Sequence, residues 1–132
     1  SMNIVDSSGW LAYFADEPNG KHFLIPLNDT ASLVVPTVTI YEVFKVVLRE
    51  SSENEALHAV VAMQKGTVVD LTPPLAIAAS KLSLEHNLPM ADSIILATAK
   101  EFDATLWTQD PDFKNINGVN YFPKKSCSNL EK

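Results

Sequence analysis

The sequence has little cysteine, little arginine and no long apolar run, and each shortage excludes a class of protein. With a single cysteine, Cys127, the chain has no disulfide of its own, so we expect a reducing compartment. No apolar run approaches the roughly 18 residues that a membrane span requires, and the first residues do not have the pattern of a signal peptide. We therefore expect a cytoplasmic protein with no membrane partner.

Positive charge is the other shortage. The formal net charge is −6, the sequence pI is about 4.9, and Arg49 is the only arginine. These values exclude a broad basic surface that binds nucleic acid by neutralising its phosphates. A function that handles phosphate must therefore take positive charge from elsewhere, and metal ions are the obvious source.

The chain does have enough apolar residues for a core. Hydrophobic residues make up 46% of the 132 residues, and this length is typical of one domain. We expect that domain to span residues 2–125, followed by a polar tail at residues 126–132.

Short apolar runs alternate with helical patterns along the chain. We predict strands at residues 2–5, 33–35, 67–71, 105–107 and 119–122. We predict helices at residues 10–14, 21–28, 53–64, 75–86 and 92–102, and one more that begins at Thr39. This alternation indicates an α/β fold with a central parallel sheet, in which ligand sites lie outside the carboxyl ends of the strands.

Four acidic residues fall near that edge of the predicted sheet. Asp6 ends the first strand, and Asp110 follows the fourth strand after two polar residues. Glu42 lies in the first turn of the helix after the second strand, and Asp92 begins a later helix. The fold can thus bring carboxylates from four distant segments into one cleft.

Three of these acids also have purely structural explanations. Glu42 with Thr39 matches a capping box, and Asp92 is acceptable as a helix N-cap. Asp110 is part of an Asp-Pro-Asp sequence that is typical of a turn. Asp6 is harder to explain in this way, because a carboxylate directly after an apolar strand is costly without a partner. No single motif decides between the two interpretations.

A cluster of carboxylates nevertheless has a chemical logic that helix caps lack. Carboxylates that lie close together repel, and their pKa values rise unless a cation neutralises them. Oxygen ligands without histidine or cysteine suit Mg²⁺ or Mn²⁺ rather than zinc. Such ions polarise a phosphoryl oxygen and activate water, and they supply the positive charge that the composition lacks.

Four segments of the sequence together resemble a known family. They are VDSS at residues 5–8, TIYE at 39–42, LPMADSIILATA at 88–99 and TQDPDF at 108–113. In this order they resemble a PIN-domain ribonuclease, most like the VapC-type toxin of a type II toxin–antitoxin pair. The resemblance implies a three-layer α/β/α PIN-like fold with about five short parallel strands. It also implies an endoribonuclease that hydrolyses RNA phosphodiesters with water activated by Mg²⁺ or Mn²⁺.

The same resemblance implies roles for individual residues. The acids expected to bind the metal and to catalyse are Asp6, Glu42, Asp92 and Asp110. Asp112 is a further candidate metal ligand, and Ser7, Ser8 and Thr108 are expected to orient the acids. The implied partners are an RNA substrate, a cognate antitoxin protein and a second copy of the chain in a homodimer.

Three basic residues are candidates for contact with RNA. Lys45 and Arg49 follow Glu42 on the same predicted helix, and Lys114 follows the last acidic segment. The alternative explanation for Lys45 and Arg49 is a solvated helix face, which is where charged residues of a helix usually lie.

Two other functions compete with the nuclease. One is a phosphoacceptor signalling domain that binds Mg²⁺, with Asp70 after the third strand as the phosphorylated residue. Against it, the first strand ends in one acid rather than in an adjacent acidic pair. The other is a catalytically inactive PIN-like binding module, which the complete set of acids disfavours.

Overall fold

The computed structural model describes residues 1–124, so the expected tail at 126–132 and Cys127 lie outside the described residues. The strands are β1 (Met2–Val5), β2 (Val34–Pro36), β3 (Thr67–Val69), β4 (Ala104–Thr108) and β5 (Val119–Tyr121). The helices are α1 (Ser7–Phe14), α2 (Gly20–Asn28), α3 (Thr37–Glu50), α4 (Glu53–Met63), α5 (Pro73–His86) and α6 (Met90–Glu101). Two short 3₁₀ helices complete the set, η1 (Thr30–Ser32) and η2 (Pro111–Phe113).

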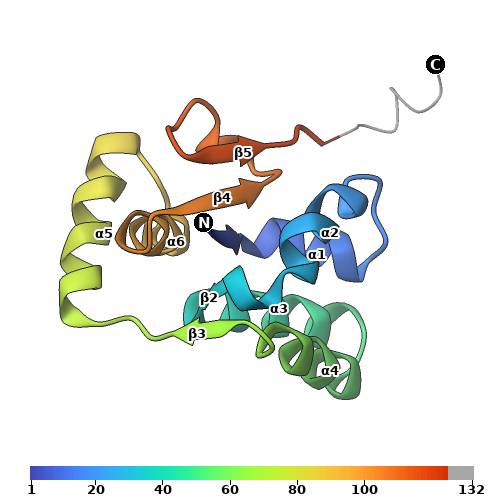
Figure 1. The fold of residues 1–132 in the computed structure, drawn as a ribbon. Helices are drawn as coiled ribbons and strands as arrows, with labels where there is room; N and C mark the ends of the chain where they lie inside the picture. Colours follow the sequence, from blue (N-terminus) through green and yellow to red (C-terminus); the bar gives the residue numbers. More distant parts are fainter. Residues whose placement is uncertain (125–132) are drawn as a thin grey trace.

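The strands are all parallel and lie in the order β3-β2-β1-β4-β5 (Figure 1). Regular pairing joins β1, β4 and β5 into one sheet and β2 with β3 into another. An isolated parallel bridge between Asn3 and Leu33 connects the two. The predicted α/β fold with a central parallel sheet is therefore confirmed. Because every strand runs the same way, all their carboxyl ends lie at one edge.

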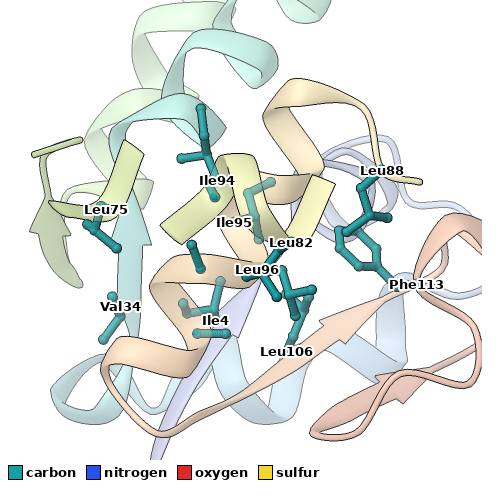
Figure 2. Packing of buried hydrophobic residues seen from close by; sticks show 13 residues of the cluster. Ile4, Val34, Leu75, Leu82, Leu88, Ile94, Ile95, Leu96, Leu106 and Phe113 are labelled. Atoms are coloured by element: carbon teal, nitrogen blue, oxygen red, sulfur yellow. The ribbon is translucent and has the colours of Figure 1, made fainter. Parts of the chain in front are cut away.

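Successive residues of β1 and β4 point to opposite faces of the sheet, and a hydrophobic cluster lies on each face. The sheet and the helices on its two faces form the three layers. Ile4 and Leu106 face a cluster with α5 and α6, whereas Val5 and Trp107 face a cluster with α1 to α4. Figure 2 shows the first cluster, in which Ile95 and other side chains of α6 pack among the strands. Helices cover both faces, which is why the strands read as unbroken apolar runs.

Several helices begin earlier than the sequence pattern predicted. α3 begins at Thr37 directly after Pro36, and α6 begins at Met90 directly after Pro89. Proline keeps the residue before it extended and fixes its own φ near −65°, so a helix cannot extend back through that residue and begins after the proline. Within the described residues, no helix has the length and apolarity needed to cross a membrane.

Candidate active site

Asp6 is buried at the carboxyl end of β1, and hydrogen bonds surround its carboxylate. The Ser8 hydroxyl donates to both carboxylate oxygens, at 2.8 and 2.9 Å. The Gly9 amide donates at 3.0 Å, and the Thr108 hydroxyl of β4 donates at 2.7 Å. Asp6 is thus also the N-cap of α1, a role that the sequence analysis did not assign to it.

Gly9 is the residue that allows this close approach. A Cβ built at Gly9 would lie 2.6 Å from a methyl carbon of Val5 and 2.9 Å from the ring of Phe23. A side chain at this position would therefore push the first turn of α1 away from β1. Glycine keeps the Gly9 amide within hydrogen-bond distance of Asp6.

Glu42 and Asp92 do not cap their helices, so the structural alternative for these two acids is wrong. Neither Pro36 nor Pro89, the N-cap residues of α3 and α6, makes a side-chain capping bond. Glu42 instead accepts a hydrogen bond from the Ser7 hydroxyl of α1 at 2.5 Å. Both acids lie beyond the cap and are free to face the edge of the sheet.

Asp92, Asp110 and Asp112 form the more open part of the site. Each offers a carboxylate oxygen, and these three oxygens all lie within 4.8 Å of one another. The Asp110 carboxylate also accepts from the Asp112 amide at 2.9 Å and caps η2, so Asp110 has the local structural role that the turn interpretation gave to this segment. Asp92 lies in the first turn of α6, where the helix dipole favours negative charge.

Burial and charge raise the pKa of two of these acids. Desolvation raises the pKa of Asp6 to about 6, against the hydrogen bonds from Thr108, Ser8 and Gly9, which lower it. The pKa of Asp92 rises to about 7, first through desolvation and then through the negative charges of Asp110, Asp6, Glu42 and Asp112. These interactions show that all five acids share one electrostatic environment, and we call them the acid cluster.

In the part of the chain that the structure describes, no cationic side chain forms an ion pair with the acid cluster. Among residues 1–124 the ion pairs are Arg49 with Glu50 at 3.2 Å and His86 with Glu85 at 3.5 Å. Neither pair includes a member of the cluster. The donor set is oxygen alone, which fits Mg²⁺ or Mn²⁺.

The structure also places the remaining candidates from the sequence. Ser7, Ser8 and Thr108 each hydrogen-bond an acid of the cluster. Lys45 and Arg49 lie three and seven residues after Glu42, which is the spacing of one helix face. Both are exposed, and the Lys45 ammonium lies 5.6 Å from the ring centre of Tyr41.

Two other candidates lie on the surface. Lys114 is exposed just after η2. Asp70, the alternative phosphoacceptor, is exposed after the edge strand β3. It contributes to neither raised pKa in the acid cluster.

Two buried amides next to the site were missed in the sequence. Asn19 and Gln109 are 5% and 3% exposed, and the Asn19 side chain donates to that of Gln109 at 3.1 Å. They are 90 residues apart in the chain, so no local pattern connects them. The single available signal was that Gln109 sits between Thr108 and Asp110.

Solved structures share this fold. A toxin–antitoxin complex from Klebsiella pneumoniae matches with a TM-score of 0.76 and 23% identity, over 89% of this chain and 95% of that chain. VapC20 from Mycobacterium tuberculosis, described as a sarcin–ricin loop cleaving toxin, matches at 0.73 and 16%, over 86% and 94%. VapBC2 from Rickettsia felis, bound to a promoter DNA fragment, matches at 0.71 and 12%, over 95% and 100%. No curated protein sequence matches significantly.

The parallel sheet with acids at its carboxyl edge thus defines an α/β protein of the class seen in these structures. A family model described as the PIN domain matches residues 4–119. The chain belongs to the PIN domain family, as its four sequence segments predicted.

Proposed function

We propose that this protein is an endoribonuclease that depends on Mg²⁺ or Mn²⁺ and hydrolyses RNA phosphodiesters. The observation that carries the proposal is the acid cluster, in which five carboxylates meet and no described cation pairs with them. The PIN domain match supports it, as does the relative described as a sarcin–ricin loop cleaving toxin.

The residues present fit a divalent cation. Asp92, Asp110 and Asp112 offer three oxygens within 4.8 Å of one another, and Asp6 and Glu42 act on Asp92 electrostatically. When bound, the cation would offset their repulsion, polarise the phosphate and activate the attacking water. It would also allow Asp92, whose pKa is about 7, to lose its proton fully at neutral pH.

The chain's own residues then have distinct tasks. Ser8, Gly9 and Thr108 hold the Asp6 carboxylate in one orientation before substrate binds. Ser7 does the same for Glu42. Lys45, Arg49 and Lys114 are proposed to contact the phosphates of RNA that crosses this edge of the sheet.

We further propose that the protein is the cytoplasmic toxin of a toxin–antitoxin pair and forms a homodimer. Two of the similar structures are described as toxin–antitoxin complexes or as VapBC bound to DNA, which supports an antitoxin partner. Exposed apolar side chains supply surface for both partners. On α3 and α4 they are Tyr41, Leu48, Leu57 and Val61, and on α5 they are Ile77 and Leu84.

The central experiment compares Asp6→Asn with wild type in cleavage of a structured RNA in the presence of Mn²⁺. Loss of a carboxylate from the site should lower the rate by about 10³-fold, because the charge stabilisation it supports is worth several kcal/mol. The expected products carry a 5′-phosphate and a 3′-hydroxyl, which end-labelling distinguishes.

Asp70→Asn is the matched control, because Asp70 is an exposed acid outside the acid cluster. It should cleave like wild type and bind Mn²⁺ with wild-type affinity in calorimetry. Full activity in Asp6→Asn, with contaminating nuclease excluded, would refute the nuclease assignment. Phosphoryl transfer from a small donor onto Asp70 would favour the signalling alternative instead.

A further inference from the structure

The side chains of Asn19 and Gln109 are buried, Gln109 lies against Ser8, and we call this pair the amide bridge. Asn19 directly precedes α2, and Gln109 lies between the end of β4 and Asp110. The Asn19 amide nitrogen donates to the Gln109 side-chain oxygen at 3.1 Å. Burying two amides is costly unless their polar atoms find partners, so each further contact of this pair matters.

One side of the amide bridge reaches the residue that holds Asp6. The Gln109 side-chain nitrogen donates to the Ser8 carbonyl oxygen at 3.3 Å. The Gln109 backbone amide donates to the Ser8 hydroxyl at 3.4 Å, and that hydroxyl donates in turn to Asp6. Gln109 therefore contacts Ser8, the residue whose hydroxyl donates to Asp6, through both its backbone and its side chain.

The other side of the amide bridge holds the chain after β5. The Asn19 amide nitrogen also donates to the carbonyl oxygens of Phe122 and Pro123, at 3.3 and 3.1 Å. The Phe122 ring stacks on His22 with ring centres 4.7 Å apart and an angle of 2° between the planes. Asn19 thus joins α2, the loop after β4 and the segment after β5.

We propose that the amide bridge is a positioning device for the acid cluster, which holds the loop at residues 108–112 against α1. The physical need for it is repulsion. Asp110 and Asp112 of this loop offer carboxylate oxygens that lie within 4.8 Å of one another and of an oxygen of Asp92, and negative charges this close repel. A loosely held loop would move away from Asp92, whereas a metal site requires its ligands to be preorganised.

The proposal rests on the proposed function only for its metal readout, and it needs two kinds of variant. Asn19→Ala removes the donor to three acceptors, and Gln109→Met keeps the side-chain volume but removes its hydrogen bonds. Leu82→Val on α5 is the control for general destabilisation, because it shortens a side chain in the hydrophobic cluster shown in Figure 2. Asn54→Ala, at an exposed position of α4, is the control for loss of an amide.

The first measurement is amide hydrogen exchange in the metal-free protein. Exchange at residues 108–113 should be faster in Asn19→Ala and Gln109→Met than in Leu82→Val, once each is corrected for its global stability. The second is calorimetric titration with Mn²⁺. Both variants should bind Mn²⁺ about tenfold more weakly than wild type, as is typical when groups that orient metal ligands are lost.

Exchange at residues 108–113 that rises no more than in Leu82→Val would overturn the proposal, as would wild-type Mn²⁺ affinity in both variants. The double variant should be no weaker than the single ones, because both substitutions break the same chain of hydrogen bonds. A wild type that binds no Mn²⁺ would contradict the proposed function, and the exchange measurement alone would then decide the positioning role.

Discussion

The acid cluster has two parts that are held in different ways. Asp6 is 2% exposed, and hydroxyl and amide donors surround its carboxylate. Asp92 is half-buried, and no side-chain hydrogen bond reaches its carboxylate among residues 1–124. The charged groups that raise its pKa are all other carboxylates. Hydrogen bonds of the protein itself orient Asp6, whereas in the proposed function a divalent cation would stabilise the charge of Asp92.

The charged forms of the two acids are destabilised by different causes. Burial destabilises the charged form of Asp6, and its hydrogen bonds offset part of this cost. Burial and four neighbouring negative charges destabilise the charged form of Asp92, and no cation among residues 1–124 forms an ion pair with it. Without a bound cation, such a cluster of acids is most stable when some of its members are protonated.

The largest effect that tests this comparison is a fall in the stability of the metal-free protein as pH rises. The pKa values of Asp6 and Asp92 are about 6 and about 7, above their ordinary value of 3.8. From the ordinary value of 3.8 up to these raised values, the native state binds more protons than the unfolded state. The free energy of unfolding therefore decreases as pH rises through this window. Asp6 alone should contribute about 3 kcal/mol, at roughly 1.4 kcal/mol per pKa unit.

Urea unfolding in EDTA from pH 4 to pH 8 measures this effect. In wild type the decrease contributed by these two acids should continue to about pH 7, and in Asp92→Asn it should end near pH 6. The variant should be the more stable protein at pH 8 without metal. Identical pH profiles for the two proteins would show that the pKa of Asp92 is not raised in the folded protein.

A smaller effect is expected from Thr108→Val, which weakens the well-held part of the cluster. The Thr108 hydroxyl donates to Asp6 at 2.7 Å and accepts from the Asp110 amide at 2.9 Å. Valine has nearly the same shape but leaves both groups without this partner. The variant should lose about 1–3 kcal/mol of stability and about 10- to 100-fold in RNA cleavage.

Thr98→Val is the matched control, because Thr98 is also buried and, among residues 1–124, its hydroxyl donates to the Ile94 carbonyl within α6 and to no acid. It should cost stability but leave cleavage per folded molecule unchanged. Equal losses of activity in the two variants, measured at full folding, would contradict a specific role for Thr108.

The smallest effect is expected from Ser7→Ala. The Ser7 hydroxyl donates to Glu42 in a partly exposed position, where water can replace it. One such hydrogen bond contributes about 0.5–1.5 kcal/mol, so kcat/KM should fall about 2- to 10-fold. Ser80→Ala on α5, an exposed serine that bonds the Ile77 carbonyl, should leave kcat/KM at the wild-type value. If kcat/KM fell as much in Ser80→Ala as in Ser7→Ala, the hydrogen bond from Ser7 to Glu42 would have no specific role in cleavage.

The sheet was predictable because burial on both faces leaves a strong apolar signal. Residues 2–5 were predicted as a strand with its observed limits, and the other four predicted strands differ from the observed ones only at their ends. Helix starts were less predictable. Thr39 and Asp92 look like caps because their side chains can accept backbone hydrogen bonds. Pro36 and Pro89 are the N-cap residues of those helices and make no side-chain capping bond, so a pattern of capping side chains does not predict where the helices begin.

The acids of the candidate site could be found from their order along the chain and from their places beside predicted strands. What holds them could be found only in part. Thr108 lies two residues before Asp110, so its proximity to the cluster follows from local sequence. Asn19 and Gln109 meet across 90 residues, and their contact depends on how α1 and α2 pack on the sheet. Local propensity carries no information about such packing.

The order of the strands has a consequence for synthesis of this protein. β1 lies at the middle of the sheet and pairs with β4, whose residues are made about a hundred residues later. At about 5–20 residues per second on the ribosome, β1 waits on the order of ten seconds for this partner. Asp110 and Asp112 emerge later still. A nascent chain therefore carries no complete acid cluster, and an enzyme of the proposed kind would not cut RNA before its residues up to Asp112 have been synthesised.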